Sequence, residues 1–384
     1  MQNEPGLLGP GSFARTLDRV GHALHDVELF RVRMPFIEPF RTARATTAAK
    51  EALLVRVRTD HGVGWGECAA QVTPEYDGET IDGARLALRD HLVPRVFAGV
   101  GIEDVRGHAS ARAALECALL DARLRAEETS LAKWLGAPSP EVEAGVAVGI
   151  GDDVGALARA AGDYAARGYR RIKCKIEPGR DVEVLQAVRA EVGDAVQVAA
   201  DANGSYELAA ARRLFDEIAD LKLQCVEQPC APGALPEHAQ LVQQGRTRVC
   251  LDESITSLPT ARAAIAARAC NAISVKVGRL GIADATRVHD VCLDAGIDAV
   301  AGGLLETGVG RAALVAVAAL PGFTMTGDCA ASDRYFGADG DVTEPFVLRG
   351  GMLQVPEGAG LGVSPAADRL ARVTVARERL TARD

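Results

Sequence analysis

Short apolar runs alternate with amphipathic stretches through the middle of the chain, and several of these runs end in a charged residue. The charged residues recur about every 25 positions, the length that a strand, a turn and a helix occupy together. They are Lys175, Asp201, Glu227, Asp252 and Lys276. The pattern therefore predicts a (β/α) barrel with charged groups at the strand ends, where catalytic groups lie in that fold.

The stretches between these runs have apolar residues at helical spacing. The first barrel strand is expected within 142–150, and later strands at 299–302 and 324–326. The expected helices cover residues 154–166, 181–192, 206–219, 232–244, 258–267 and 282–295.

The regions on either side of the repeat follow other patterns. Residues 27–34, 51–59 and 63–67 are typical of strands, and 79–96 and 109–127 of helices, which together predict an α+β domain. We expect a flexible lead-in at 1–26, the α+β domain at 27–142, the barrel at 143–345 and a C-terminal segment at 346–384 that packs on the α+β domain.

Composition narrows the classes of partner. The 384 residues carry a net charge of −9 without a dense run of Lys or Arg, which argues against nucleic acid and membrane as partners. The nine cysteines show no CxxC pairing, so we expect reduced thiols in a cytoplasmic protein. No targeting segment is visible, and the longest apolar stretch, 312–320, is too short to span a bilayer.

Three consecutive strand ends carry the carboxylates Asp201, Glu227 and Asp252. Three carboxylates that converge on one point repel one another unless a cation holds them. Oxygen ligands on separate strands suit Mg²⁺, with Mn²⁺ or another divalent cation as an alternative. The competing interpretation is that these residues are helix caps or surface acids at strand ends.

Lysines flank the three acids. Lys173 and Lys175 are two residues apart on one strand, so both side chains point to the same face. A lysine titrates near 10.4 and a useful base needs roughly 7 to 8, a shift that burial and a neighbouring cation supply. With Lys276 beyond the acids, a base lies on each side of a metal-bound substrate. The alternative is that the lysines only pair with the carboxylates.

This arrangement predicts removal of a proton next to a carboxylate, with the metal neutralising the enediolate that develops. With these residues, the chain resembles the enolase superfamily, in its muconate-lactonising subgroup. The motifs that carry the resemblance are Lys173-Cys174-Lys175, Asp201-Ala202-Asn203-Gly204, Glu227-Gln228-Pro229, Leu251-Asp252-Glu253-Ser254 and Ser274-Val275-Lys276.

The resemblance implies a (β/α)₇β barrel of the α/β class with an N-terminal α+β capping domain that the C-terminal tail completes. It implies Asp201, Glu227 and Asp252 as metal ligands, and Lys175 and Lys276 as the acid/base pair. Lys173 then supports the first base, and Asn203 is a second polar group near the metal. Members of the superfamily also suggest a homo-oligomer and a small carboxylate substrate.

Further motifs are similar to the branch of o-succinylbenzoate synthases and N-succinylamino acid racemases. They are Pro39-Phe40-Arg41-Thr42, Gly64-Trp65-Gly66-Glu67-Cys68, residues 302–311, Gly327-Asp328 and Ser332-Asp333-Arg334-Tyr335. The first expectation is a Mg²⁺-dependent lyase that dehydrates 2-succinyl-6-hydroxy-2,4-cyclohexadiene-1-carboxylate in menaquinone biosynthesis. The alternatives are an N-acylamino acid racemase, which is an isomerase, or an enzyme with both activities.

The two reactions differ in what they require of Lys276. In the dehydration Lys276 stays charged, whereas in racemisation it acts as a base. Arg279 is a cation three positions later, and we expect it to lower the pKa of Lys276. The alternative for Arg279 is a surface arginine on a loop.

The remaining expectations concern substrate contacts. The loop around Phe36, Phe40 and Arg41 is expected to cover the substrate, and Gly303 and Leu304 to line the pocket around its tail. Glu253, next to a metal ligand, is expected near the site, and Cys329 is expected to reshape the pocket. Two other classes stay open, a Schiff-base lysine enzyme on the same barrel and a barrel used only for binding.

Overall fold

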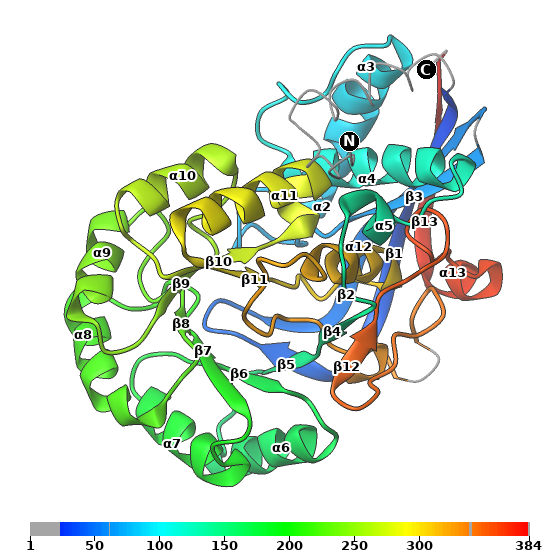
Figure 1. Cartoon of the computed structure of the whole chain (residues 1–384). Coiled ribbons are helices and arrows are strands. Elements are labelled where there is room, and N and C mark those ends of the chain that lie inside the picture. The colour runs from blue at the N-terminus through cyan, green and yellow to red at the C-terminus, as the bar shows by residue number, and fades with distance from the viewer. Residues whose placement is uncertain (1–23, 61, 338–339, 383–384) are drawn as a thin grey trace, which may run out of the picture.

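The computed structural model describes residues 24–60, 62–337 and 340–382. Most of the predicted lead-in, as far as residue 23, lies outside the described residues, and the first strand begins at Leu24. Figure 1 shows two parts, a curled parallel sheet ringed by helices and an antiparallel sheet with its own helices. The predicted α/β class and the capping domain are confirmed.

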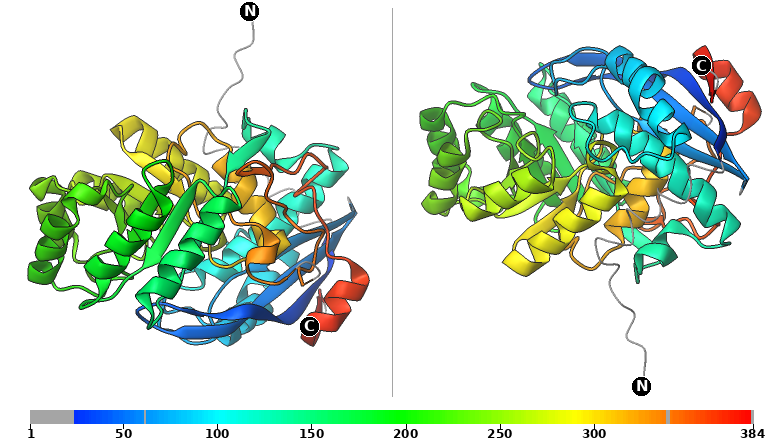
Figure 2. Two further views of the ribbon diagram at one scale, coloured as in Figure 1. Left: turned by 90° about the horizontal axis from the view of Figure 1, so that it is seen from below. Right: turned by 90° about the horizontal axis from the view of Figure 1, so that it is seen from above.

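The capping domain is built on a four-stranded antiparallel sheet in the order β13-β1-β2-β3. The strands are β1 (Leu24–Arg41), β2 (Thr46–Thr59), β3 (Gly62–Cys68) and β13 (Thr374–Thr381). Because β13 pairs with β1, the C-terminal segment joins the N-terminal sheet, and Figure 2 shows the two on one flank of the molecule.

Helices cover one face of the capping sheet. They are α2 (Ile81–Ala87), the π-helical turn η2 (Leu88–Leu92), α3 (Val93–Phe97) and α4 (Ala109–Ala126). Helix α4 lies so close to β3 that a Cβ on Gly66 would be 2.0 Å from the carbonyl oxygen of Ala114. Glycine is therefore required at Gly66 for close packing of the helix on the strand.

The second sheet is parallel throughout, in the order β11-β10-β9-β8-β7-β6-β5. Its strands are β5 (Gly145–Val148), β6 (Arg171–Lys175), β7 (Gln197–Asp201), β8 (Val226–Glu227), β9 (Val249–Leu251), β10 (Ala272–Val275) and β11 (Asp298–Ala301). The helices that follow them are α6 (Val154–Ala166), α7 (Asp181–Val192), α8 (Leu208–Glu217), α9 (Leu235–Gln244), α10 (Leu258–Ala266), α11 (Val277–Ala295) and α12 (Gly308–Ala318).

Short elements complete the fold. Strand β4 (Glu141–Glu143) pairs with β12 (Met352–Gln354), ahead of β5. The others are α5 (Leu131–Leu135), α13 (Ala367–Val373) and the 3₁₀ turns η3 (Ala219–Leu221) and η4 (Ser332–Arg334).

Two predicted elements differ from the observed ones. Helix α11 begins at Val277 rather than at 282, because Gly281, at a φ of 77°, joins an extra turn to the main helix. The strand predicted at 324–326 is only a single bridge, between Met325 and Val300. The segment nevertheless runs beside β11, since the backbone N–H of Asp328 donates to the carbonyl of Ala301 at 2.7 Å.

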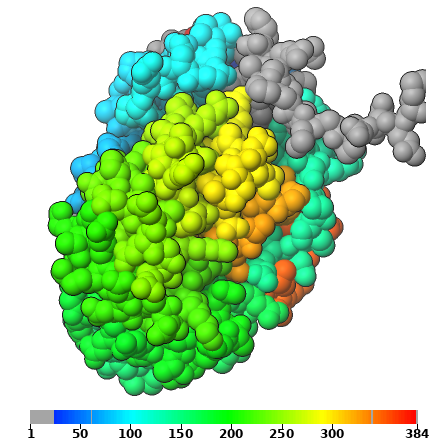
Figure 3. Space-filling model, turned by 60° about the vertical axis from the view of Figure 1, so that its left-hand side comes forward, coloured from blue at the N-terminus to red at the C-terminus, as the bar shows by residue number. Residues whose placement is uncertain are grey.

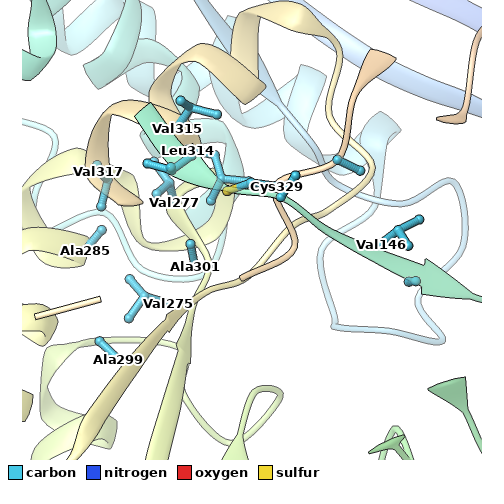
Figure 4. Packing of buried hydrophobic residues seen from close by; sticks show 14 of the residues in the cluster. Val146, Val275, Val277, Ala285, Ala299, Ala301, Leu314, Val315, Val317 and Cys329 are labelled. Carbon is cyan, nitrogen blue, oxygen red and sulfur yellow. The ribbon is translucent and has the colours of Figure 1, made fainter. Parts of the chain in front are cut away.

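The main core lies between the parallel sheet and its helices. Figure 4 shows side chains of β10 and β11 beside those of α11 and α12, among them Val275, Ala299, Ala285 and Leu314. In Figure 3 the capping helices lie directly against the yellow α11 segment. The two parts thus share an extended interface, and the pocket lies where their loops meet.

Candidate active site

A pocket opens between the strand ends of the parallel sheet and two loops of the capping domain. The capping loops contribute residues 40–47 and 71–76, and the parallel sheet contributes the ends of β6, β7 and β10 and the loop after β11. The pocket therefore lies at the edge of the sheet that the repeat period predicted.

Four carboxylates, three of them buried, gather at this edge. Asp201 ends β7, Glu227 ends β8 and Asp252 follows β9, each with about 1% of its surface exposed. The fourth is Asp328, from the segment beside β11, which pairs with Lys173 and Arg171. The sequence pattern did not place Asp328 in the site, although Asp328 lies two residues after 324–326, the last strand that the repeat predicts.

Lys173 lies among these acids. Its Nζ is 2.8 Å from Glu227 Oε2, 2.7 Å from Asp328 Oδ2 and 3.4 Å from Asp201 Oδ2. Burial works to lower the pKa of Lys173, but Asp328, Glu227 and Asp201 raise it well above its ordinary value. Lys173 is therefore a permanent cation here, and the expectation that paired lysines lower each other's pKa is wrong for it.

Lys175 reaches toward the pocket from the end of β6. Its Nζ donates to Asp201 Oδ2 at 2.6 Å and to Asn203 Oδ1 at 3.1 Å. Asn203 is itself held, because its Nδ2 donates to Glu253 Oε1 at 3.0 Å. Burial and the neighbouring Asp252 raise the pKa of Glu253 to about 7.

Lys276 occupies the other side of the acids, after β10. Its Nζ is 3.1 Å from Asp252 Oδ2 and donates to the carbonyl of Gly303 at 2.9 Å. Burial works to lower the pKa of Lys276, but Asp252, Glu227 and Asp328 raise it well above its ordinary value. Gly302 makes room for this side chain, since a Cβ there would be 2.7 Å from Lys276 Cδ.

Arg279 is buried in the first turn of α11, so the surface interpretation is wrong. It donates to the side chain of Asp252 at 2.9 Å and to the carbonyl of Asp252 at 2.8 Å. Tyr76, which sequence reasoning missed, donates to both oxygens of Asp252 at 2.9 and 3.0 Å. Arg279 thus acts on Asp252, and the expected lowering of the pKa of Lys276 does not occur.

The expected substrate contacts are only partly correct. Gly303 and Leu304 line the pocket. Phe36 packs on Tyr335 and Phe336 outside the lining, and Arg41 pairs with Asp152 and Glu177. Phe40, the third residue of the loop expected to cover the substrate, lines the pocket together with Arg44, whereas Phe36 and Arg41 do not.

Cys329 also differs from its expectation. Its side chain is buried in the main core, and Figure 4 shows it beside α12. The pocket lining includes the neighbouring Ala330 but not Cys329, so the thiol does not shape the pocket directly.

The donor set suits a hard divalent cation. Asp201, Glu227 and Asp252 offer only oxygen ligands, and Glu227 Oε1 is buried without a hydrogen-bond partner. In the part of the chain that the structure describes, no three His, Cys, Asp or Glu side chains form a ready-made metal site. Lysine ammonium groups instead lie between the carboxylates, as the ion pairs above show.

The arrangement has the parts needed for proton transfer beside a carboxylate. Two lysines reach the pocket from β6 and from the end of β10, with the acids of β7, β8 and β9 between them.

No helix in the described ranges is both long and apolar enough to cross a membrane.

Comparisons with known proteins agree with this geometry. Residues 25–136 match the N-terminal domain of mandelate racemase / muconate lactonizing enzyme, and 156–369 match the enolase C-terminal domain-like family. The chain is 46% identical to an N-succinylamino acid racemase from Amycolatopsis sp., over 92% of this chain and 98% of the relative.

Two further comparisons concern an o-succinylbenzoate synthase and a solved structure. An o-succinylbenzoate synthase from Geobacillus kaustophilus is 38% identical over 88% of this chain and 92% of the relative. A structure of an enolase superfamily member from Listeria innocua superposes with a TM-score of 0.88 at 32% identity, covering 94% of this chain and 99% of that one.

Proposed function

This chain belongs to the enolase superfamily, and from that premise we propose that it transfers protons at the carbon next to a substrate carboxylate, as an N-acylamino acid racemase. One observation carries the proposal: Lys175 and Lys276 reach one pocket from opposite sides of the acids. Racemisation needs a base on each face of the reacting carbon, and a divalent cation held by Asp252 and Glu227 would offset the negative charge that raises the pKa of Lys276. The relative at 46% identity supports the same reaction.

The residues divide the work by position. In each direction one of the two lysines, Lys175 or Lys276, removes the proton from its face, and the other, as an ammonium, delivers a proton to the opposite face. Each lysine is held by an oxygen partner, Asn203 or Gly303. Lys173 stays charged and buried beside Lys175. Asp201, Glu227 and Asp252 would hold Mg²⁺, which when bound supplies positive charge for the substrate carboxylate as it gains negative charge. Tyr76 and Arg279 fix the orientation of Asp252.

Dehydration to o-succinylbenzoate, the first expectation from the sequence, is the second candidate. It needs a base on one face only, with Lys276 as a fixed cation. The ion pair of Lys276 with Asp252, and the relatives at 33–38% identity, favour it. A protein with both activities fits the same residues.

The fold supports either reaction in the same way. We propose that residues 324–328 take the eighth strand position and close the curled sheet into a (β/α)₇β barrel. The bridge of Met325 to Val300 and the bond from Asp328 to Ala301 support this closure.

Incubation with Mg²⁺ in D₂O tests the proposal. Each enantiomer of an N-succinyl amino acid is supplied, and deuterium at the α-carbon is followed by NMR together with optical rotation. We expect exchange and loss of optical rotation from both enantiomers. Absence of exchange, with turnover of 2-succinyl-6-hydroxy-2,4-cyclohexadiene-1-carboxylate in a parallel sample, would overturn the racemase in favour of the dehydratase.

A further inference from the structure

Two basic residues of the capping domain contact the barrel loops that hold the acid/base lysines. Arg44 lies in the turn between β1 and β2, and Lys50 lies within β2. Each donates to backbone carbonyls of a loop at the pocket edge rather than to a carboxylate at short range. Sequence reasoning assigned no role to either residue.

Arg44 binds the loop of Asn203, the residue that accepts a hydrogen bond from Lys175. Its Nε donates to the carbonyl of Asn203 at 2.8 Å, and its Nη1 donates to the carbonyl of Glu75 in the second capping loop. The side chain of Asn203 accepts from Lys175 Nζ. Asn203 has a φ of 46°, a left-handed conformation that persists where surrounding contacts enforce it. Arg44 is one of these contacts, so it fixes the oxygen that holds Lys175.

Lys50 has the same relation to Lys276. The Lys50 ammonium is buried and donates to the carbonyl of Leu304 at 3.0 Å. The preceding carbonyl, that of Gly303, accepts from Lys276 Nζ at 2.9 Å. The next residue, Leu305, has a φ of 58°, which is costly for an apolar side chain. Lys50 therefore stabilises a strained turn whose neighbouring peptide holds Lys276.

We propose that Arg44 and Lys50 are positioning residues, each acting through a barrel loop on a different acid/base lysine. The capping domain then sets the geometry on each face of the substrate separately, Arg44 for Lys175 and Lys50 for Lys276. This inference rests on the proposed two-base reaction. It extends that reaction by giving the capping domain a part in proton transfer as well as in covering the substrate.

The test measures α-proton exchange in D₂O from each pure enantiomer, with Mg²⁺ present, for the full-length protein. Exchange is used because it reports proton removal from each face, whereas racemisation reports both faces together. Lys175→Ala and Lys276→Ala first establish which lysine serves which enantiomer. Arg44→Met is expected to lower kcat for exchange of the enantiomer that Lys175 deprotonates by roughly tenfold or more, since small displacements of a catalytic group are costly. Lys50→Met is expected to have the same effect on the enantiomer that Lys276 deprotonates.

A matched control variant distinguishes loss of positioning from a general loosening of the contact between the capping domain and the barrel. Arg41, three residues before Arg44, also joins the capping domain to barrel residues, but it touches neither lysine loop carbonyl. Arg41→Met is therefore expected to change exchange of both enantiomers by the same factor.

The outcomes are distinct. Opposite enantiomer biases in Arg44→Met and Lys50→Met, with partial recovery in Arg44→Lys, support the inference. Equal loss for both enantiomers in both variants overturns it while the racemase stands. Where either Met variant melts far below the wild type, Arg44→Lys and Lys50→Gln are used with the same criterion. Absence of exchange in the wild-type protein removes the two-base reaction and the inference with it.

Discussion

The strand ends and the capping loops hold the same lysines by different kinds of contact. At the strand ends, every lysine Nζ meets at least one buried carboxylate, as Lys173 does with Glu227 and Asp328. In the capping domain, the hydrogen bonds of Arg44 and Lys50 go to neutral carbonyls, and the carboxylate of Glu253 lies 4.0 Å from Arg44 Nε. In the proposed reaction, the strand ends would determine which bond is broken, whereas the capping domain would determine how each base is positioned.

Removal of divalent cations should cause the largest loss of exchange, and it acts on the strand ends alone. We expect a chelator to lower exchange of both enantiomers by at least about 10³-fold, since a Lewis acid supplies several kcal/mol. Measurement of exchange before chelation, after it and after readdition of Mg²⁺ checks this. Unchanged exchange after chelation would remove the metal from the strand ends and favour a Schiff-base lysine, which borohydride trapping on Lys175 would reveal.

Substitution of one of the two lysines that act as bases should cause the next largest loss of exchange, and mainly for one enantiomer. Lys276→Ala is expected to lower exchange of one enantiomer by about 10²–10⁴-fold, the usual worth of a positioned acid or base. Exchange of the other enantiomer through Lys175 should change far less. NMR exchange rates from each pure enantiomer measure both values, and equal losses would contradict the two-base arrangement.

A smaller loss is expected when the base is displaced rather than removed. A Cβ at Gly302 would be 2.3 Å from Ser274 Oγ and 2.7 Å from Lys276 Cδ. Gly302→Ala should therefore lower kcat for the Lys276 enantiomer by roughly 10- to 100-fold. Gly155→Ala is the matched control, because its Cβ would meet only the side chains of Arg159 and Asp153, and it should leave kcat unchanged.

The smallest expected effect is a pH dependence of stability in the capping domain. Glu116 of α4 accepts from the backbone N–H of Ala283, and burial raises its pKa from 4.5 to about 7. An acid with a raised pKa stabilises the fold while protonated. This contribution is complete below about pH 4.5 and is lost as the pH rises through 7.

Urea unfolding at several pH values between 5 and 8 measures this contribution. The wild-type free energy of unfolding should fall by about 1–3 kcal/mol over that range. Glu116→Gln, which stays neutral, should show a shallower fall. Glu67 and Glu253, whose pKa values are also raised to about 7, keep some of the slope. An identical slope in wild type and variant would show that Glu116 is not protonated in the folded state.

The strand ends could be predicted because strands alternate. Lys173 and Lys175 had to share a face, and the repeat placed Asp201, Glu227 and Asp252 at one edge of the sheet. The pKa directions were not predictable in the same way. They depend on how many carboxylates surround each lysine, and the fourth, Asp328, comes from a segment without regular strand pairing.

The capping contacts could not be predicted for a related reason. Tyr76 and Arg44 lie in turns whose backbone directions no periodic pattern encodes. The same uncertainty applies along β1, where Phe40 lines the pocket, while Phe36 packs in the core and Arg41 forms ion pairs with barrel residues. Arg279 was named from its spacing to Lys276, but its actual partner, Asp252, depends on the first turn of α11.

The pairing of β13 with β1 has a consequence for synthesis on the ribosome. The first strand of the capping sheet has an open edge until residues 374–381, near the end of the chain, emerge and pair with it. Domains generally begin to fold as they are made, so the parallel sheet has its complete sequence before the capping sheet does. The capping sheet therefore gains its fourth strand only after the parallel sheet has been made, and the edge of β1 is exposed to mispairing during that interval.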